Sequence, residues 1–265
     1  MNQDLCSISD CNNRNGLQFN EDKCRVMVFG KRLVDNNIIL KINDIELDYT
    51  DNIKDLGIIF DNKLTFRDHI FSIISKAKKS LWLIKYYTKN FNNINAIIQL
   101  YNSIVKSILM FGSVVWTTNN KELIYEIEKV QNDFLGYISY KMHISYNYFQ
   151  HDYTDILGIL EMSSLFDSRN THDLLFIYKL FNNKLNLSNI KSQFEEYKPK
   201  KNLRNRELIF SIHKKYINKK HTKIKNKSTI YRLSVKVNRY AKWINIKAQS
   251  FGIFKKAVKD NINEI

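Results

Sequence analysis

Four basic residues recur at helical spacing between positions 67 and 89 of the chain. Arg67, Lys78, Lys85 and Lys89 follow one another at intervals of eleven, seven and four residues, which return to nearly the same side of an α-helix. Such a row of cations can neutralise successive phosphates of a nucleic-acid backbone. Lysine stems can equally cover the edge of an apolar core while their ammonium groups stay in water. The spacing alone leaves both interpretations of this basic stripe open.

A second set of candidate binding residues lies in the last 75 residues (265 − 190). Residues 1–190 contain 21 Lys and Arg against 21 Asp and Glu, whereas residues 191–265 contain 21 against 5, so the whole net charge of +16 (21 − 5) falls in this region. Segregated positive charge predicts a polyanionic partner, nucleic acid before an anionic membrane surface. The cations that we expect to bind there are Lys214, Lys215, Lys219, Lys220, Arg232 and Arg239.

Aromatic residues are interleaved with these cations. Tyr216, Tyr231, Tyr240, Trp243 and Phe251 offer ring faces on which unpaired bases can stack, so the region has the composition of a single-strand surface. The same rings can instead form the core of this region. For Trp243 and Phe251 we favour the core.

Residues for metal or covalent catalysis do not form a recognisable motif. His143, His151, Asp152 and Asp155 are of the types that bind divalent metals, but their spacing matches no compact pair such as H-E-x-x-H, and we interpret them as surface side chains. The sequence contains no Gly-rich phosphate loop, G-x-S-x-G motif or adjacent Asp-Asp pair. Nucleotide hydrolysis, acyl transfer and two-metal nucleotidyl transfer therefore lack their usual residues. We expect no metal or other cofactor in this chain.

Composition predicts a mostly helical chain with a core of its own. One proline (Pro199), seven glycines and 44% hydrophobic residues favour long helices around a buried core. Cys6, Cys11 and Cys24 lack paired spacing, which indicates free thiols in a reducing, intracellular compartment, nuclear or cytoplasmic. The most apolar run, residues 107–116, is too short to span a bilayer.

The secondary structure that must position these residues is predicted to change from strands to helices near position 62. Strands are predicted over Cys24–Phe29 and Leu56–Phe60, and a hairpin over Ile38–Ile42 and Ile45–Tyr49 turns at residues 43 and 44. Helices are predicted over residues 66–84 after a Thr65–Asp68 capping box, 94–108, 123–138 after Asn119-Asn120, and 163–181. The fold class is therefore α+β, with short antiparallel strands followed by a helical bundle. We expect regions 1–62, 63–190 and 191–265, with a linker over 191–201.

Several short words of sequence occur in the order typical of one family. They are Gln3-Asp4-Leu5, Asn15-Gly16-Leu17, Asn20, Lys23-Cys24, Met27 to Phe29, Lys54-Asp55-Leu56-Gly57, "LTFRDHI" (64–70), "LYNSIVKSILMFGSVVW" (100–116) and "EKVQNDF" (128–134), with weaker echoes towards the end. In this order the chain resembles the late palm, thumb and following part of the reverse transcriptase of a non-LTR (LINE-type, jockey-like) retrotransposon.

The resemblance implies roles for residues that spacing alone does not assign. Lys23 matches a lysine proposed to help pyrophosphate leave, and Lys54 to Gly57 match the primer grip. The helices after Thr65 match a thumb that tracks the template-primer duplex, which adds weight to phosphate contacts by the basic stripe. The family's Tyr-x-Asp-Asp motif, which holds two magnesium ions, has no counterpart here.

The resemblance therefore predicts a truncated polymerase fragment that binds RNA, DNA or their hybrid without polymerising. Because a palm sheet reduced to its last strands exposes an unpaired edge, we expect weak amide protection over residues 24–60. The alternative from another class is a basic helical adaptor that binds a protein or an anionic membrane surface.

Overall fold

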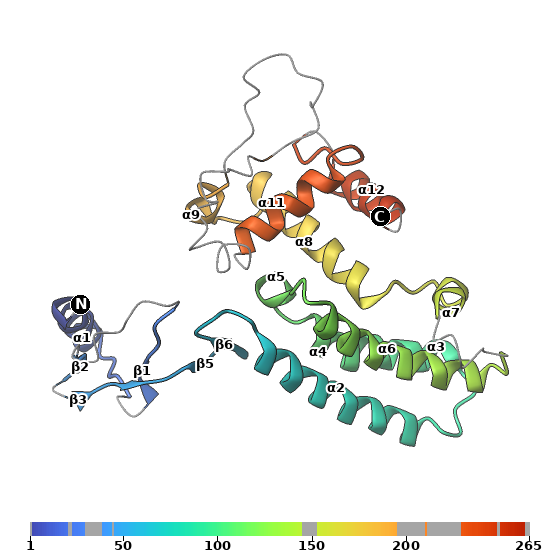
Figure 1. The fold of residues 1–265 in the computed structure, drawn as a ribbon, viewed down its shortest axis with the longest axis horizontal. Helices are drawn as coiled ribbons and strands as arrows, with labels where there is room; N and C mark the ends of the chain where they lie inside the picture. The colour runs from blue at the N-terminus through green and yellow to red at the C-terminus, as the bar shows by residue number, and fades with distance from the viewer. Residues whose placement is uncertain are drawn as a thin grey trace, which may run out of the picture. The chain divides into compact units, whose positions relative to one another are not determined.

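The computed structural model describes residues 2–20, 23–29, 39–43, 45–144, 153–194, 210, 229–247 and 250–262. The chain divides into two compact units, Met1–His69 and Ile70–Ile265. Among the described residues, the strands lie in the first unit and most of the helices in the second (Figure 1). The predicted α+β fold class is confirmed.

In its described residues before α2, the first unit holds one α-helix and three two-stranded pairings. Its elements are α1 (Asn2–Arg14), β1 (Arg25–Val26), β2 (Lys41–Ile42), β3 (Ile45–Glu46), β4 (Asp48–Tyr49), β5 (Asn52–Asp55) and β6 (Ile58–Asp61). β2 and β3 pair antiparallel, with Ile42 opposite Ile45, which confirms the predicted hairpin. β1 and β4 pair in parallel. Helix α1, which was not predicted, packs against β2, and Ser9 Oγ donates to Asn43 Oδ1 at 2.6 Å.

Strands β5 and β6 form an antiparallel hairpin with a two-residue turn. Asp55 pairs with Ile58, and the turn residues Leu56 and Gly57 have φ values of +44° and +88°. Two consecutive positive φ values are typical of a type I′ turn, which fits the right-handed twist of the flanking strands. The strand predicted to begin at Leu56 therefore begins at Ile58.

Asp61 caps the start of the following helix, α2 (Arg67–Tyr87). Its carboxylate accepts hydrogen bonds from the backbone amides of Lys63, Thr65 and Phe66 and from the Thr65 hydroxyl, at 2.6–3.0 Å. Burial raises the pKa of Asp61, but these hydrogen bonds outweigh burial and hold the pKa below its ordinary value of 3.8. Asp61 thus satisfies amides that would otherwise lack an acceptor at the helix start.

Asp61→Ala should weaken this cap by about 1–2 kcal/mol. Because the folded-state pKa is depressed, the stabilisation is present above pH 3.8 and is lost as the pH falls through the folded pKa. Amide hydrogen exchange at Thr65 and Phe66 is the measurement, and roughly 5–30-fold faster exchange at pH 7 is the expected result. Asp61→Asn keeps an acceptor without the charge and should show a smaller effect with no such pH dependence. Unchanged exchange in Asp61→Ala would contradict the cap.

The second unit is helical from α2 onwards. Its further elements are α3 (Ile94–Leu100), the π-helical η2 (Tyr101–Lys106), α4 (Ser107–Met110), α5 (Ser113–Trp116), α6 (Lys121–Lys141), α7 (Thr154–Ile159), α8 (Leu165–Phe181), α9 (Ser188–Lys191), α11 (Thr229–Tyr240) and α12 (Phe251–Asn261). The four predicted helices are confirmed as α2, α3 to α4, α6 and α8. Asn120 caps α6 as predicted, its side chain accepting from the Glu122 amide at 2.9 Å.

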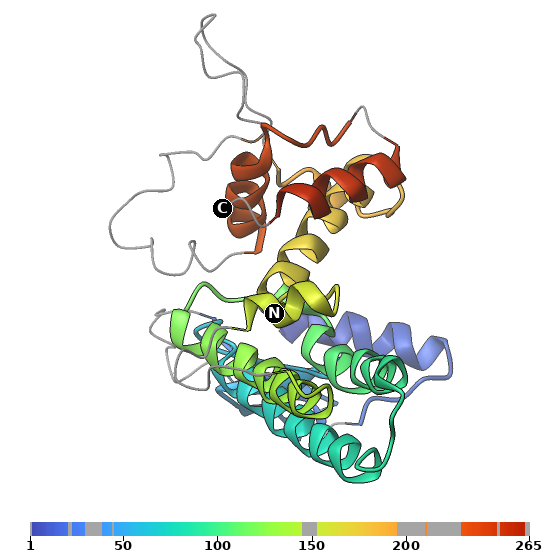
Figure 2. The same cartoon turned by 90° about the vertical axis from the view of Figure 1, so that its right-hand side faces the viewer.

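Helix α8 packs against α4, α5 and α6 on one part of its length and against α11 and α12 on another. Figure 2 shows α8 running from the helices around α6 to α11 and α12. Leu174 and Ile177 of α8 share a buried apolar cluster with Leu233, Val237 and Phe254 of the C-terminal helices. The described part of residues 191–265 therefore shares its core with α8 and belongs to the same compact unit.

The predicted linker over 191–201 begins within this core. Phe194 is 6% exposed, and its ring lies 5.7 Å from that of Phe181 and 5.3 Å from that of Phe210. Residues 195–201 lie outside the described part of the chain. Among the described helices, none combines the length and apolar character that a membrane crossing requires.

Candidate nucleic-acid interface

Helix α2 has one apolar and one polar side, because its apolar residues recur every three or four positions. The side chains of Ile70, Ile73, Ile74, Ala77, Leu81 and Ile84 are buried. The opposite side carries Lys79, Trp82 and Tyr86, and Lys78 lies at its edge; all four are exposed. The buried side fixes the orientation of the helix and thereby presents these cations and rings to solvent.

Three aromatic rings at the C-terminal end of α2 are exposed. Trp82, Tyr86 and Tyr87 are 61%, 64% and 70% exposed. The rings of Trp82 and Tyr86 stack, with centroids 5.4 Å apart and planes 16° apart, and Tyr87 meets Tyr86 edge-on at 5.2 Å. Exposed rings held in this way offer flat surfaces for stacking with bases. These rings were not among the predicted site residues, although Trp82 and Tyr86 lie four residues apart on the polar side of the predicted helix.

The structure brings part of the basic stripe together beside these rings. Lys78 and Lys89 are exposed and Lys85 is half-buried, and Lys89 lies just beyond the last residue of α2. Arg67, the first residue of the same helix, is exposed but belongs to the first compact unit. The second unit therefore carries three of the four stripe cations, two on α2 and Lys89 just after its end.

Lys85 lies against Tyr137 of α6. The ammonium groups of Lys85 and Lys141 are 5.9 Å and 5.6 Å from the centre of the Tyr137 ring, and the Tyr137 hydroxyl shares a 2.9 Å hydrogen bond with Thr88 Oγ1. Lys141 Nζ donates to the Lys89 carbonyl at 2.9 Å. Burial lowers the pKa of Lys85, and the nearby Asp133 carboxylate opposes this shift. These contacts hold the C-terminal ends of α2 and α6 side by side, as Figure 1 shows.

A hollow of about 460 Å³ lies on α6 beside this contact, with Lys85 of α2 among the residues that line it. It is lined by Lys85, Tyr125, Lys129, Asn132, Asp133, Gly136, Tyr137, Tyr140 and Tyr153. Four of these nine residues are tyrosines, and the rings of Tyr125 and Tyr140 are 60% and 80% exposed. The hollow therefore combines ring faces with ammonium, amide and carboxylate groups.

The remaining predicted residues lie elsewhere or outside the described part. Lys54 is exposed on β5 and Gly57 lies in the adjoining turn, where its positive φ explains why glycine is suited to the position. Lys23 is exposed shortly before β1. Lys214, Lys215, Lys219 and Lys220, with Tyr216, lie outside the residues that the structure describes.

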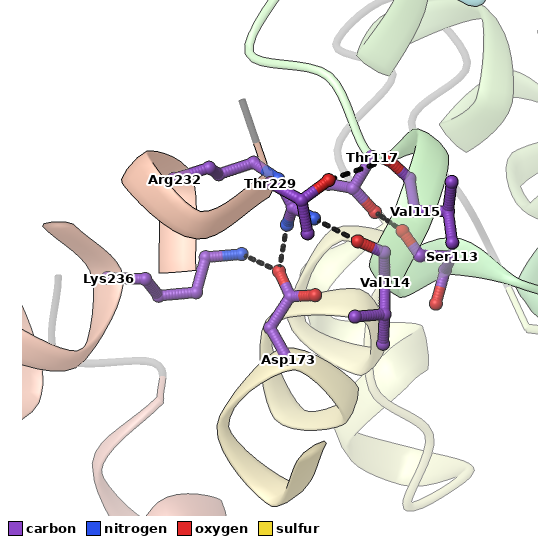
Figure 3. Close-up of polar contacts among 8 residues, drawn as sticks. All are labelled: Ser113, Val114, Val115, Thr117, Asp173, Thr229, Arg232 and Lys236. Atoms are coloured by element: carbon purple, nitrogen blue, oxygen red, sulfur yellow. Dashed lines mark hydrogen bonds and ion pairs between the residues drawn. The ribbon is translucent and has the colours of Figure 1, made fainter. Parts of the chain in front are cut away.

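Arg232 is buried, which corrects its assignment to a binding surface. It is 6% exposed, and its guanidinium donates to the Asp173 carboxylate and to the Val114 carbonyl. Lys236 donates to the same carboxylate, which is fully buried. Figure 3 shows Asp173 of α8 between these two cations of α11, with Val114 of α5 beyond. The sequence displays the charge of Arg232 but not the partner 59 residues away, so Arg232 is left out of the proposed interface.

The aromatic residues of the last region mostly join the core. Tyr240 is 3% exposed, and Trp243 and Phe251 pack against the same apolar cluster. The core interpretation of Trp243 and Phe251 is thus confirmed. Tyr231 is 39% exposed on α11, and the predicted cation Arg239 is exposed on the same helix.

A further buried ion pair joins α6 to α8. Arg169 Nη2 lies 3.1 Å from Glu128 Oε1, and the Leu165 amide donates to Glu128 Oε2 at 3.0 Å. Burial raises the pKa of Glu128 and lowers that of Arg169, and their mutual attraction opposes both shifts. Because each charge faces the other inside the fold, we interpret this pair as part of the packing of α8.

Among the described residues, no cluster of three or more His, Cys, Asp or Glu is arranged to hold a metal ion, and His151 and Asp152 lie outside them. Comparison with known protein families, with curated proteins and with solved structures gives no match to this chain.

Proposed function

We propose that the chain binds RNA, DNA or an RNA-DNA hybrid without sequence preference, through the exposed cations and rings of α2 and through the basic region 191–265. The observation that carries the proposal is the Trp82–Tyr86 stack, exposed on the helix that carries Lys78 and Lys85 and that ends just before Lys89. Phosphate neutralisation supplies affinity without sequence preference, and every base has a face that can stack on a ring. The proposed setting is intracellular, nuclear or cytoplasmic.

We further propose a relationship to the late palm and thumb of a non-LTR retrotransposon reverse transcriptase, in which this chain retains binding and does not polymerise alone. The proposal rests on the order of the sequence words. Two features support it: Lys54 and Gly57 lie at the end of one hairpin, and helices follow directly. Magnesium would belong only to a polymerase that supplies the aspartates of the Tyr-x-Asp-Asp motif.

Charge reversal on α2 tests the proposed interface. The double variant Lys78→Glu with Lys89→Glu should weaken binding to a labelled 20-nucleotide strand by roughly tenfold or more at 0.1 M salt, because two phosphate contacts become repulsive. Trp82→Ala should cost about 1–3 kcal/mol of binding free energy, or roughly 5- to 150-fold in Kd. Fluorescence anisotropy measures both effects.

Matched controls separate these effects from general changes in charge or fold. Lys121→Glu alters an exposed cation at the first position of α6, and Phe111→Ala removes a ring that is also 61% exposed. Neither should change Kd by more than about twofold. Binding that is unaffected by the α2 variants would remove α2 from the interface. Flotation with anionic liposomes, combined with no mobility shift of nucleic acid, would instead support a membrane-binding adaptor.

A further inference from the structure

The hollow on α6 has one wall held by contacts and one side open to solvent. Tyr137 is fixed by its hydrogen bond to Thr88 and by the flanking ammonium groups of Lys85 and Lys141. Gly136 leaves room there, since a Cβ at this position would lie 3.7 Å from the Tyr153 hydroxyl. The Tyr125 and Tyr140 rings remain exposed to solvent. A larger side chain at Gly136 would therefore extend into the space that these residues line.

The chemistry of the lining fits one kind of ligand. Tyrosine rings stack on flat aromatic ligands, the Asn132 amide can both donate to and accept from a base edge, and the Asp133 carboxylate can accept from an amino group. Lys85 and Lys129 supply positive charge beside them. In a duplex the faces of the bases are stacked and their pairing edges are occupied, whereas an unpaired base presents both.

We propose that this hollow takes an unpaired nucleobase of a single-stranded nucleic acid whose backbone follows the cations of α2. The inference rests on the proposed nucleic-acid binding and specifies its substrate class: single strands are bound more tightly than duplexes of the same length. Trp82 and Tyr86 then stack with neighbouring bases of the same strand, and the hollow holds one base away from that stack.

Gly136→Leu tests the proposal by filling the hollow without changing charge. Leucine has the higher helix propensity, and the added side chain meets the end of the Tyr153 side chain rather than backbone. The matched control is Gly252→Leu in α12, where an added Cβ meets nothing within 4 Å. Kd for a 20-nucleotide strand and for a 20-base-pair duplex is measured at the same salt with the full chain, and circular dichroism verifies folding.

The wild-type chain and Gly252→Leu should bind the strand roughly tenfold more tightly than the duplex, since one stacked base contributes about 1–3 kcal/mol. Gly136→Leu should lose this preference and keep its duplex affinity. If the wild-type chain binds both ligands equally, or if folded Gly136→Leu keeps the preference or weakens both ligands alike, the base pocket is overturned while nucleic-acid binding stands. If the wild-type chain binds neither ligand, the proposed function fails as well.

Cross-linking locates the base independently. A strand containing 5-iodouracil should give adducts on Tyr125, Tyr140 or Tyr153, identified by peptide mass spectrometry, and these should disappear in Gly136→Leu. Adducts found only on Trp82 and Tyr86 would overturn the base pocket and retain α2 as the interface.

Discussion

Asp173→Ala is expected to destabilise the second compact unit by about 3–5 kcal/mol, one of the two largest effects that we predict. The carboxylate is fully buried and accepts from Arg232 and Lys236, whose side chains are 6% and 13% exposed. Removal of the carboxylate leaves two cations facing each other in a site where water cannot replace their partner. Urea denaturation followed by circular dichroism measures the loss.

Two controls separate loss of the partner from loss of charge. Asp260→Ala removes an exposed carboxylate on α12 and should change stability by less than about 0.5 kcal/mol. The triple variant Asp173→Leu, Arg232→Met and Lys236→Met removes all three charges, and it should recover most of the lost stability because no buried charge is then unpaired. A loss below 1 kcal/mol in Asp173→Ala would show that the two cations reach water.

Neutralising the cations between Lys198 and Lys227 should greatly flatten the salt dependence of nucleic-acid binding. This segment contains twelve Lys and Arg, and each phosphate neutralised on a single strand contributes about 0.7 to the slope of log K against log salt. Replacement of all twelve by Gln should lower the slope by about 4 if half of them contact phosphates. Binding titrations at salt concentrations between about 50 and 200 mM give the slope of log K against log salt.

The twelve positions should be substituted rather than deleted. Deletion of residues 191–265 would remove α11 and α12, with them much of the apolar cluster around Leu174, and would leave Asp173 without its cations. Lys→Arg replacement within the same segment is the matched control, since it keeps the charge and should keep the slope. A slope unchanged by the Gln variant would assign the phosphate contacts to α2 alone.

The elements that the sequence predicted are those determined by residues close together in the chain. Helix α6 is predicted by its helical period and by the cap at Asn120, and helix α8 by its helical period alone. The β2–β3 hairpin is predicted by the turn that separates two short strands. Helix α1 is rich in Asn, Ser and Asp, residues of low helix propensity that favour caps and turns, so its composition does not predict a helix. The π-helical turns at Tyr101–Lys106 have no sequence signature that the helical period distinguishes.

The candidate site was only half predictable for a related reason. The spacing of Lys78 and Lys85 locates the basic stripe, because position along one helix decides it. Arg232 and the hollow depend on partners from other elements: Arg232 on Asp173, and the hollow on the meeting of α2 with α6. Charge can be counted in a sequence, but whether a charged side chain faces solvent is decided by contacts between residues that are far apart in the sequence.

The contacts of Arg232 with Asp173 and Val114 also have a consequence for how the chain folds. Arg232 joins Asp173 and Val114 across 59 and 118 residues, a sequence separation more usual in slowly folding β-proteins than in helical bundles. During synthesis, α5 and α8 leave the ribosome long before α11, and until then the Asp173 carboxylate has neither of its cations. We therefore expect the helices of the second unit to form early, whereas final closure of its core waits for the last part of the chain to be made.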